Sequence, residues 1–301
     1  MKGETNLNTG VKHRSVYQTV TMILIAIIAV VIFLFPLYWI VTGSFKTPGA
    51  INSSVPEWWP KEWVMRNFNE LFSKRSAPLW ELHVPLSEWF TQDNSQIVFS
   101  TGPTVPAAIR WLINTVFMSV TAMIITCVTA SLAGYALAKK RFAGRAILFS
   151  LIVAAMALPK QVILIPLLRE MSSLHLSDTI WSVIFPIVGW PFGVFLMKQF
   201  SESIPGEILE AARIDGAGEI KTFTTIVFPM IKPGVGALAI FTFINCWNAY
   251  FMQLVMLQGE FGQDYGLLMA GAALASVPII IVFLVFQKYF TQGITMGAVK
   301  G

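Results

Sequence analysis

The chain has 301 residues, of which 55% are hydrophobic and only 12% are charged. This charged share is about half that of an ordinary soluble protein, so the composition places the chain in the membrane class. The formal net charge of +5 would suit a nucleic-acid binder, but the basic residues gather at the ends of apolar runs, where they indicate membrane orientation. Cys127 and Cys246 both lie inside apolar runs, and we expect small packing residues there rather than a disulfide or a metal site.

Six apolar runs are each long enough to cross a hydrocarbon core of about 30 Å as a helix. In chain order they are Val20–Val41, Trp111–Ala138, Ala146 to beyond Pro159 and Lys160, Thr179–Met197, Pro233–Leu257 and Tyr265–Gln287. Backbone polar groups inside a bilayer need internal partners, and runs of this length are too long for barrel strands. We therefore predict an all-α bundle of six transmembrane helices in residues 20–301. The segment 1–19 precedes it, and the first run is too long for a signal peptide.

Lysine and arginine in the short connections predict the orientation. Basic residues precede the first span, crowd two of the connections and follow the last span: Lys12, Arg14, Lys139, Lys140, Arg141, Arg145, Lys198, Arg213, Lys221, Lys232, Lys288 and Lys300. With six spans they all share one side, which the positive-inside rule makes the cytoplasm, together with both termini. The long segment 43–110 and the short acidic loop Gln258–Asp264 are then extracellular.

The predicted outer segment 43–110 is rich in proline and tryptophan. Proline at this density breaks helices and favours turns. The tryptophans could form a small core, lie at the membrane interface or contact a partner. They are Trp58, Trp59, Trp63, Trp80 and Trp89.

The connection 201–232, between the fourth and fifth spans, has its own helical pattern. Pro205 suits the first turn of a helix. An apolar side at roughly helical spacing follows, made of Ile208, Leu209, Ala212 and Ile214. Asp215, Gly216 and Gly218 then predict a break, at which Gly216 needs either a positive φ or a close contact. A second helical stretch leads to Pro229 and Pro233, so we expect a helix–turn–helix on the inner face.

This connection contains the run Glu210-Ala211-Ala212, followed by Gly216, Ile226 and Phe228-Pro229 at the spacing of a known motif. It resembles the EAA loop of ABC-importer permeases and departs from it at Phe228, where leucine is usual. Further segments are similar to the MalG-type half of carbohydrate importers: Phe35–Tyr38, Ser44–Lys46, Ala133–Ala138, Ile165–Leu167, Phe241–Asn248 and Gly297–Gly301. The stretch Ser76–Pro106 looks like an insertion, to which nothing from the family applies.

The resemblance implies that the loop is a coupling helix, which docks into a groove on a separate ATPase subunit. The coupling residues would be Glu210, Ala211, Ala212, Arg213, Asp215 and Gly216. Small side chains allow close approach, and Glu210 and Asp215 can form charge-assisted hydrogen bonds. The alternative is an amphipathic helix that only lies on the membrane, but its acidic start fits an anionic inner leaflet poorly.

The same resemblance implies the partners and the location. They are a second permease, two ATPase subunits that bind ATP and Mg, and an extracellular or periplasmic sugar-binding protein, in the bacterial cytoplasmic membrane. By position, Trp89, Glu260 and Asp264 are candidate contacts for the binding protein.

Catalytic and nucleotide-binding patterns are missing from the chain. There is no G-x-x-x-x-G-K-[ST] loop, so we expect ATP to bind in the partner subunits. The run Gly234–Ala239 matches G-x-G-x-x-A but opens an apolar helix with no preceding strand, which favours small-residue helix packing. Three scattered histidines give no metal cluster, and we expect no cofactor and no catalytic residue. The alternatives are an intramembrane enzyme and an ion-coupled secondary transporter, which would normally show internal repeats.

The fifth span carries the amides and aromatic rings that a sugar needs for hydrogen bonds and stacking. Asn245, Trp247, Asn248, Tyr250, Phe251 and Gln253 are therefore candidates for the translocation path. The same amides could instead bridge helices, and the partner permease could hold most substrate contacts. Lys160 either marks the outer end of the third span and snorkels to water, or faces the cavity and attracts an acidic sugar. The sequence leaves the identity of the sugar open.

Overall fold

The computed structural model describes residues 16–74, 76–84, 97–177, 179–249 and 265–298. The chain divides into two compact units. The N-terminal unit contains Met1–Glu70 and Asp264–Leu274, and the main unit contains Leu71–Gln263 and Ala275–Gly301.

The N-terminal unit is dominated by α1 (Val16–Ser44). Almost every residue of this helix is apolar, and none of its most hydrophobic window is buried by the rest of the chain. A helix that is apolar all round is expected to lie against lipid or other subunits. The predicted first span is therefore confirmed as the middle of a longer helix. The short helices α2 (Pro48–Ile51) and α3 (Arg66–Asn69) follow it, and the unit also holds the start of α14 (Tyr265–Ala298).

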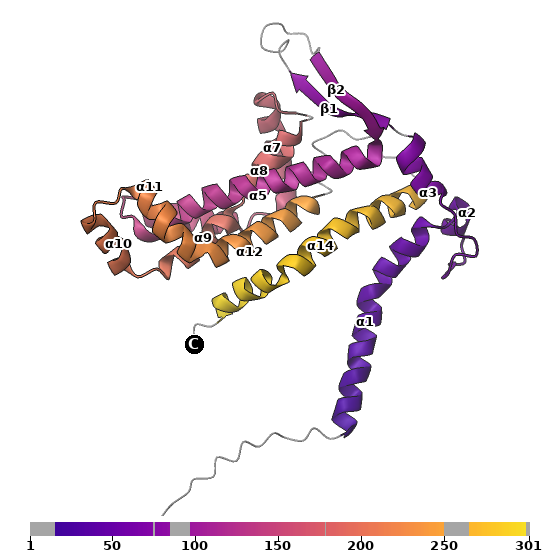
Figure 1. The fold of residues 1–301 in the computed structure, drawn as a ribbon, viewed down its shortest axis with the longest axis horizontal. Helices are drawn as coiled ribbons and strands as arrows, with labels where there is room; N and C mark the ends of the chain where they lie inside the picture. The colour runs from indigo at the N-terminus through magenta and orange to yellow at the C-terminus, as the bar shows by residue number, and fades with distance from the viewer. Residues whose placement is uncertain (1–15, 75, 85–96, 178, 250–264, 299–301) are drawn as a thin grey trace, which may run out of the picture. The chain divides into compact units, whose positions relative to one another are not determined.

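The main unit is a bundle built around α5 (Ala107–Lys139) (Figure 1). Packed against it are α8 (Ile180–Val188), α9 (Pro191–Glu202) and α12 (Phe228–Trp247). Close approach depends on small residues, because a Cβ on Gly134 would lie 2.6 Å from the backbone of α9. A Cβ on Gly234 would lie 2.5 Å from the Phe200 ring, which supports helix packing as the reason for that glycine. Cys127 and Cys246 form no disulfide, and Cys246 is buried in the core.

The described residues are mostly helical, which confirms the predicted helical bundle, and they also contain one β-hairpin that the sequence did not predict. The strands β1 (Ser76–Val84) and β2 (Ile97–Pro106) pair antiparallel, with Ser76 opposite Pro106 and Val84 opposite Ile97. They coincide with the predicted insertion and contain the aromatic and β-branched residues that favour strands. In Figure 1 the hairpin lies at one end of α5, and α10 (Gly206–Ile214) and α11 (Glu219–Thr222) lie at the opposite end of the bundle.

The described residues contain five helices that are long and apolar enough to span a membrane: Val16–Ser44, Ala108–Lys139, Ile180–Glu202, Glu219–Trp247 and Tyr265–Val285. The predicted third span is instead two shorter helices, α6 (Arg145–Ala155) and α7 (Lys160–Ser173). Pro159, which has no N–H, precedes α7 and separates the two. Lys160 is therefore the first residue of a helix and does not lie within a continuous span. A smaller break at Gly189 and Trp190 separates α8 from α9.

The fifth span begins earlier than predicted. One continuous helix runs from Glu219 to Trp247, through α11, the π-helical turn η2 (Phe223–Val227) and α12. The wider turn η2 precedes Pro229 and Pro233, each of which removes a helical hydrogen bond. The predicted second helical stretch of the loop and the predicted span are thus a single element. The predicted end of this span, Leu257, lies outside the described residues.

Candidate functional site

The EAA loop is organised around α10, whose inner side belongs to the core of the main unit. Leu209 and Ala212 are buried, with 8% and 5% of their surface exposed. Leu209 lies in a cluster with Ala130, Tyr135, Met197, Ile204, Val227, Ile231 and Leu238. The prediction that Ile208 and Ile214 belong to the same buried side is wrong, because they are 37% and 86% exposed. A helix rotates about 100° per residue, which turns these two side chains away from the Leu209 side.

The end of α10 explains Gly216. This glycine has a φ of +72°, in the left-handed region. The N–H of Ala217 donates to the carbonyl of Ala212 at 2.9 Å, and the N–H of Gly216 donates to that of Arg213 at 3.0 Å. This pair of bonds is a Schellman motif. No atom of the described residues lies within 4 Å of a Cβ placed on Gly216. Of the two predicted reasons for a glycine here, the positive φ applies, and no close contact with the described part of the chain does.

The outer side of α10 is polar and open. Glu210, Ala211, Arg213, Asp215 and Gly216 are all exposed. Ala212 is the exception among the predicted coupling residues, because it packs inside its own unit. Ile220, shortly after the turn, is 82% exposed, so two large apolar side chains flank Gly216 on the surface. Charged and apolar groups are thus displayed together on a helix whose position the core fixes.

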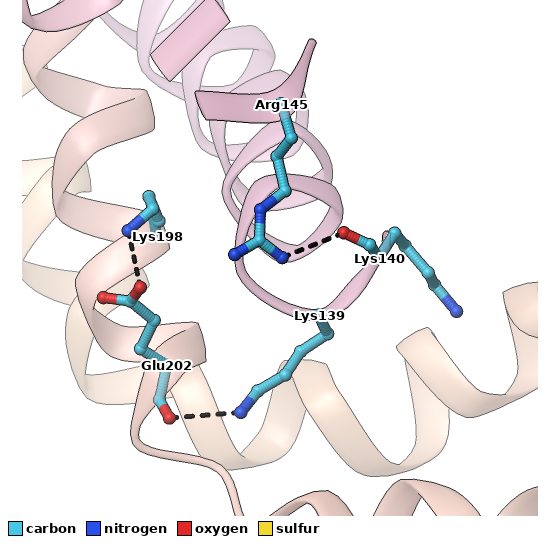
Figure 2. Close-up of polar contacts among 5 residues, drawn as sticks. All are labelled: Lys139, Lys140, Arg145, Lys198 and Glu202. Carbon is cyan, nitrogen blue, oxygen red and sulfur yellow. Dashed lines mark hydrogen bonds and ion pairs between the residues drawn. The ribbon is translucent and has the colours of Figure 1, made fainter. Parts of the chain in front are cut away.

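Two adjacent lysines at the end of α5 contact both flanks of α10. Lys139 Nζ donates to the carbonyl oxygen of Glu202 at 3.1 Å (Figure 2). It also donates to the carbonyl of Ile204 at 2.5 Å, just before α10. Lys140 forms a hydrogen-bonded ion pair with the Glu219 carboxylate, just after α10. Its ammonium also lies 5.1 Å from the centroid of the Tyr135 ring. The end of α5 is therefore linked to the start and the end of the EAA loop.

A second pair of basic residues supports this arrangement. Lys198 is buried on α9, and its Nζ lies 2.5 Å from a carboxylate oxygen of Glu202 and 4.2 Å from the centroid of the Phe149 ring. Arg145 Nη1 donates to the carbonyl of Lys140 at 3.1 Å, so the start of α6 is tied to the same corner (Figure 2). Residues read from the sequence as orientation signals therefore also make specific contacts. In the sequence, a basic cluster after one span and acidic residues on both sides of the EAA motif are the features that indicate these contacts.

The structure describes the side chains of some residues predicted for the translocation path, and others lie outside the described residues. Trp247 is 9% exposed, its Nε1 donates to the carbonyl of Ala275 at 3.2 Å, and its ring stacks on Phe243 at 5.5 Å. Its observed role is thus to connect α12 with α14. Asn245 is half-buried on α12, and Asn248 is exposed just beyond the end of that helix. Outside the described residues lie Tyr250, Phe251, Gln253, Glu260, Asp264, Trp89 and the side chain of Lys160.

Among the residues that the structure describes, no group of three or more His, Cys, Asp and Glu side chains is placed to hold a metal ion.

Known proteins are similar to this chain in sequence and in fold. The family model "Binding-protein-dependent transport system inner membrane component" matches residues 130–296, which include the whole EAA loop. The arabinooligosaccharides transport system permease protein AraQ of Bacillus subtilis is 34% identical over 224 residues, covering 69% of this chain and 79% of that protein. The melibiose/raffinose/stachyose import permease protein MelC of the same species is 30% identical over 307 residues, covering 96% and 99%.

A solved structure supports the fold. The crystal structure of a bacterial ABC transporter involved in the import of the acidic polysaccharide alginate matches with a TM-score of 0.66 at 21% identity, covering 91% of this chain and 96% of that chain. Together, the family match and these relatives identify a transport subunit rather than an enzyme. The chain therefore belongs to the family of binding-protein-dependent transport system inner membrane components, the membrane-spanning permease subunits of ABC importers.

Proposed function

We propose that this permease carries a sugar or oligosaccharide inward, and that α10 couples it to a separate ATPase subunit. One observation carries the coupling proposal: α10 is fixed on one side by the core and displays Glu210, Arg213 and Asp215 on the other. A helix that rested on the membrane would need its apolar side free. Here Leu209 and Ala212 are buried inside the main unit, which favours a protein partner over a lipid surface.

The contacts around α10 suggest how movement reaches the spans. When paired ATPase subunits close, a docked α10 shifts with them. Lys139 and Lys140 link its flanks to α5, and the helix Glu219–Trp247 continues directly from the loop into the membrane. Two arrangements of the ATPase subunits can thereby favour two arrangements of the spans, which is the basis of alternating access.

The cargo is proposed from the relatives. The printed names of AraQ and MelC refer to arabino-oligosaccharides and to melibiose, raffinose and stachyose, and the solved transporter imports alginate. All of these are carbohydrates, which supports a sugar cargo here.

The remaining partners and the orientation follow from the same proposal. A second permease completes the path, two ATPase subunits bind ATP and Mg, and an outer sugar-binding protein delivers the cargo, with Trp89, Glu260 and Asp264 as candidate contacts.

The end of α5 nearest α10 is surrounded by basic residues, which favours a cytoplasmic position for this end and for both termini. These residues are Lys139, Lys140, Arg141 and Arg145.

The test is Glu210→Ala in the purified complex. Loss of a charge-assisted hydrogen bond at a docked surface weakens assembly by roughly tenfold or more. We expect the variant to lose the ATPase stimulation given by the sugar-loaded binding protein, or to lose the ATPase subunits, while the membrane part still purifies. Glu207→Ala, an exposed carboxylate in the first turn of the same helix, is the matched control. Full stimulation and full transport in Glu210→Ala would contradict the coupling role.

A further inference from the structure

Three tryptophans of the N-terminal unit gather on the outside of α1. Trp58, Trp59 and Trp63 are 61%, 60% and 52% exposed. The Trp58 ring lies 6.0 Å from the rings of both Phe35 and Trp39, measured between centroids. The Trp59 ring lies 6.4 Å from Tyr38 and 5.3 Å from Trp63. Side chains that are more than half exposed do not form a core, so a core position is excluded for these three tryptophans.

The positions along α1 show that the chain folds back after this helix. Phe35, Tyr38 and Trp39 lie before the end of α1 at Ser44, and the rings of the later residues Trp58 and Trp59 pack beside them. At 1.5 Å per residue, Phe35 and Tyr38 lie roughly 9–14 Å back from the helix end. The two indoles therefore sit alongside the last turns of α1 and not beyond its end.

Several polar contacts hold this fold-back in place. The Tyr38 hydroxyl donates to the carbonyl of Trp58, and the buried Lys46 ammonium donates to the carbonyl of Glu57. The same ammonium lies 4.2 Å from the centroid of the Trp39 ring. Asn67, which is also buried, donates to the carbonyls of Ser44 at 2.9 Å and Lys46 at 3.2 Å. Because the backbone is fixed at these points, the outward position of the indoles belongs to the fold.

The position of these rings relative to the hydrocarbon core of the bilayer indicates which molecules cover them. The helix α1 has 29 residues, about 43 Å, whereas about 20 residues cross the hydrocarbon core. The hydrophobic run ends near Val41, so Phe35–Trp39 lie in the last turns of the core and Trp58 and Trp59 lie beside them. The exposed residues Ile32, Phe33 and Leu34 continue the apolar surface along α1. Indole rings at such a boundary place an apolar body in lipid and an N–H among headgroups.

We propose that Trp58, Trp59 and Trp63 form an interfacial anchor, which seats the end of α1 in the headgroup region of the bilayer. Its occupant is lipid. A water-soluble partner, such as a sugar-binding protein, approaches from beyond the end of α1, whereas Trp58 and Trp59 lie back along it and the Trp63 ring packs on Phe45, directly after the helix end, at 5.2 Å between centroids. This inference does not rest on the coupling role of α10, nor on which side of the membrane the end of α1 faces.

Tryptophan emission of the intact complex in phosphatidylcholine–phosphatidylglycerol vesicles tests the anchor. The emission that disappears in Trp59→Phe or Trp63→Phe belongs to these rings. We expect most of it to be quenched by lipids brominated close to the headgroup, less by lipids brominated near the chain end, and little by aqueous acrylamide. Trp247→Phe is the control, because that ring is 9% exposed and its emission should resist all three quenchers.

Two outcomes would overturn the anchor. Strong quenching by acrylamide alone would place the rings in water. Resistance to every quencher, as expected for Trp247, would place them against another subunit of the complex. If Phe variants do not assemble, nitroxide labels on Trp59→Cys and Trp63→Cys give the same distinction, through their relative access to oxygen and to a water-soluble nickel complex.

Discussion

The region after α1 and the region around α10 are each held by a lysine that donates to backbone carbonyls of a later segment, but their exposed surfaces differ. The Lys46 ammonium donates to the carbonyl of Glu57, and the Lys139 ammonium donates to the carbonyls of Glu202 and Ile204. Lys46 is buried under the Trp39 ring, and the surface around it is aromatic. Lys139 is half-buried, and the nearby surface of α10 is charged. A lysine of this kind fixes a segment, while the exposed side chains of that segment decide whether it faces lipid or protein.

The burial of Lys46 has an electrostatic consequence. Desolvation lowers the pKa of the Lys46 ammonium below its ordinary value, and the Glu57 carboxylate partly opposes this effect. A carbonyl and an aromatic face compensate the buried charge. Lys46 holds the segment after α1, whereas the half-buried Lys139 lies beside the proposed coupling helix.

The largest expected effect concerns sidedness, on which the proposed roles of the two regions depend. Asn52→Cys and Ser203→Cys place thiols at exposed positions in the two regions. In intact cells an impermeant maleimide should label Asn52→Cys fully and Ser203→Cys only after permeabilisation, because the basic connections are expected inside. Labelling of both from the same side would show that the two regions do not face opposite compartments, and the reverse pattern would invert the topology.

The next effect concerns the turn after α10. Gly216→Trp should abolish most of the stimulated ATPase activity, because the bulky residue strains a backbone at φ +72° and obstructs a docked partner. Gly218→Ala should remain near wild type, since Gly218 has a φ of −68° and open space around it.

Gly216→Asn sharpens this prediction. Asparagine tolerates the left-handed region better than most residues, so this variant should keep more activity than Gly216→Trp. Equal activity in Gly216→Trp and wild type would remove Gly216 from the proposed interface.

A smaller effect is expected from the lysines that flank α10. Lys139→Met removes the donor to Glu202 and Ile204 and should lower the sugar transported per ATP by a few-fold, while ATPase subunits stay bound. For the Lys140–Glu219 pair, the swap Lys140→Glu with Glu219→Lys should recover more transport than either single change. Lys221→Met, an exposed lysine on α11, is the control. If Lys139→Met and Lys221→Met behave alike, the link from the loop to α5 carries no movement.

The smallest effect concerns Lys160, the first residue of α7. If its ammonium faces the cargo, Lys160→Gln should weaken uptake of a uronate-containing oligosaccharide more than uptake of a neutral one. The measurement is uptake of both sugars by reconstituted vesicles. An equal reduction for both sugars would assign the lysine to the end of a helix, where it reaches water.

Local patterns in the sequence determined the membrane class, the five long apolar helices and the EAA loop. The apolar runs predicted α1, α5, the pair α8 and α9, α12 and α14, because the length of an apolar run is a local property and the bilayer sets the length required. Asp215 and Gly216 likewise predicted the end of α10, since a left-handed residue is a local demand that glycine meets.

Contacts distant in the sequence decided the rest. Helical spacing grouped Ile208, Leu209, Ala212 and Ile214, but only the tertiary structure selected Leu209 and Ala212 for burial, with Leu209 in a cluster that includes residues of α5, α9 and α12. The partners of Lys139 lie more than 60 residues away in the chain, and no periodicity indicates them. Similarly, the sequence allows Trp58 and Trp59 to lie in a core, at the membrane interface or against a partner, and only the return of the chain beside α1 distinguishes these positions. A side chain's neighbours across the fold determine its burial and its bonds, and only the tertiary structure supplies those neighbours.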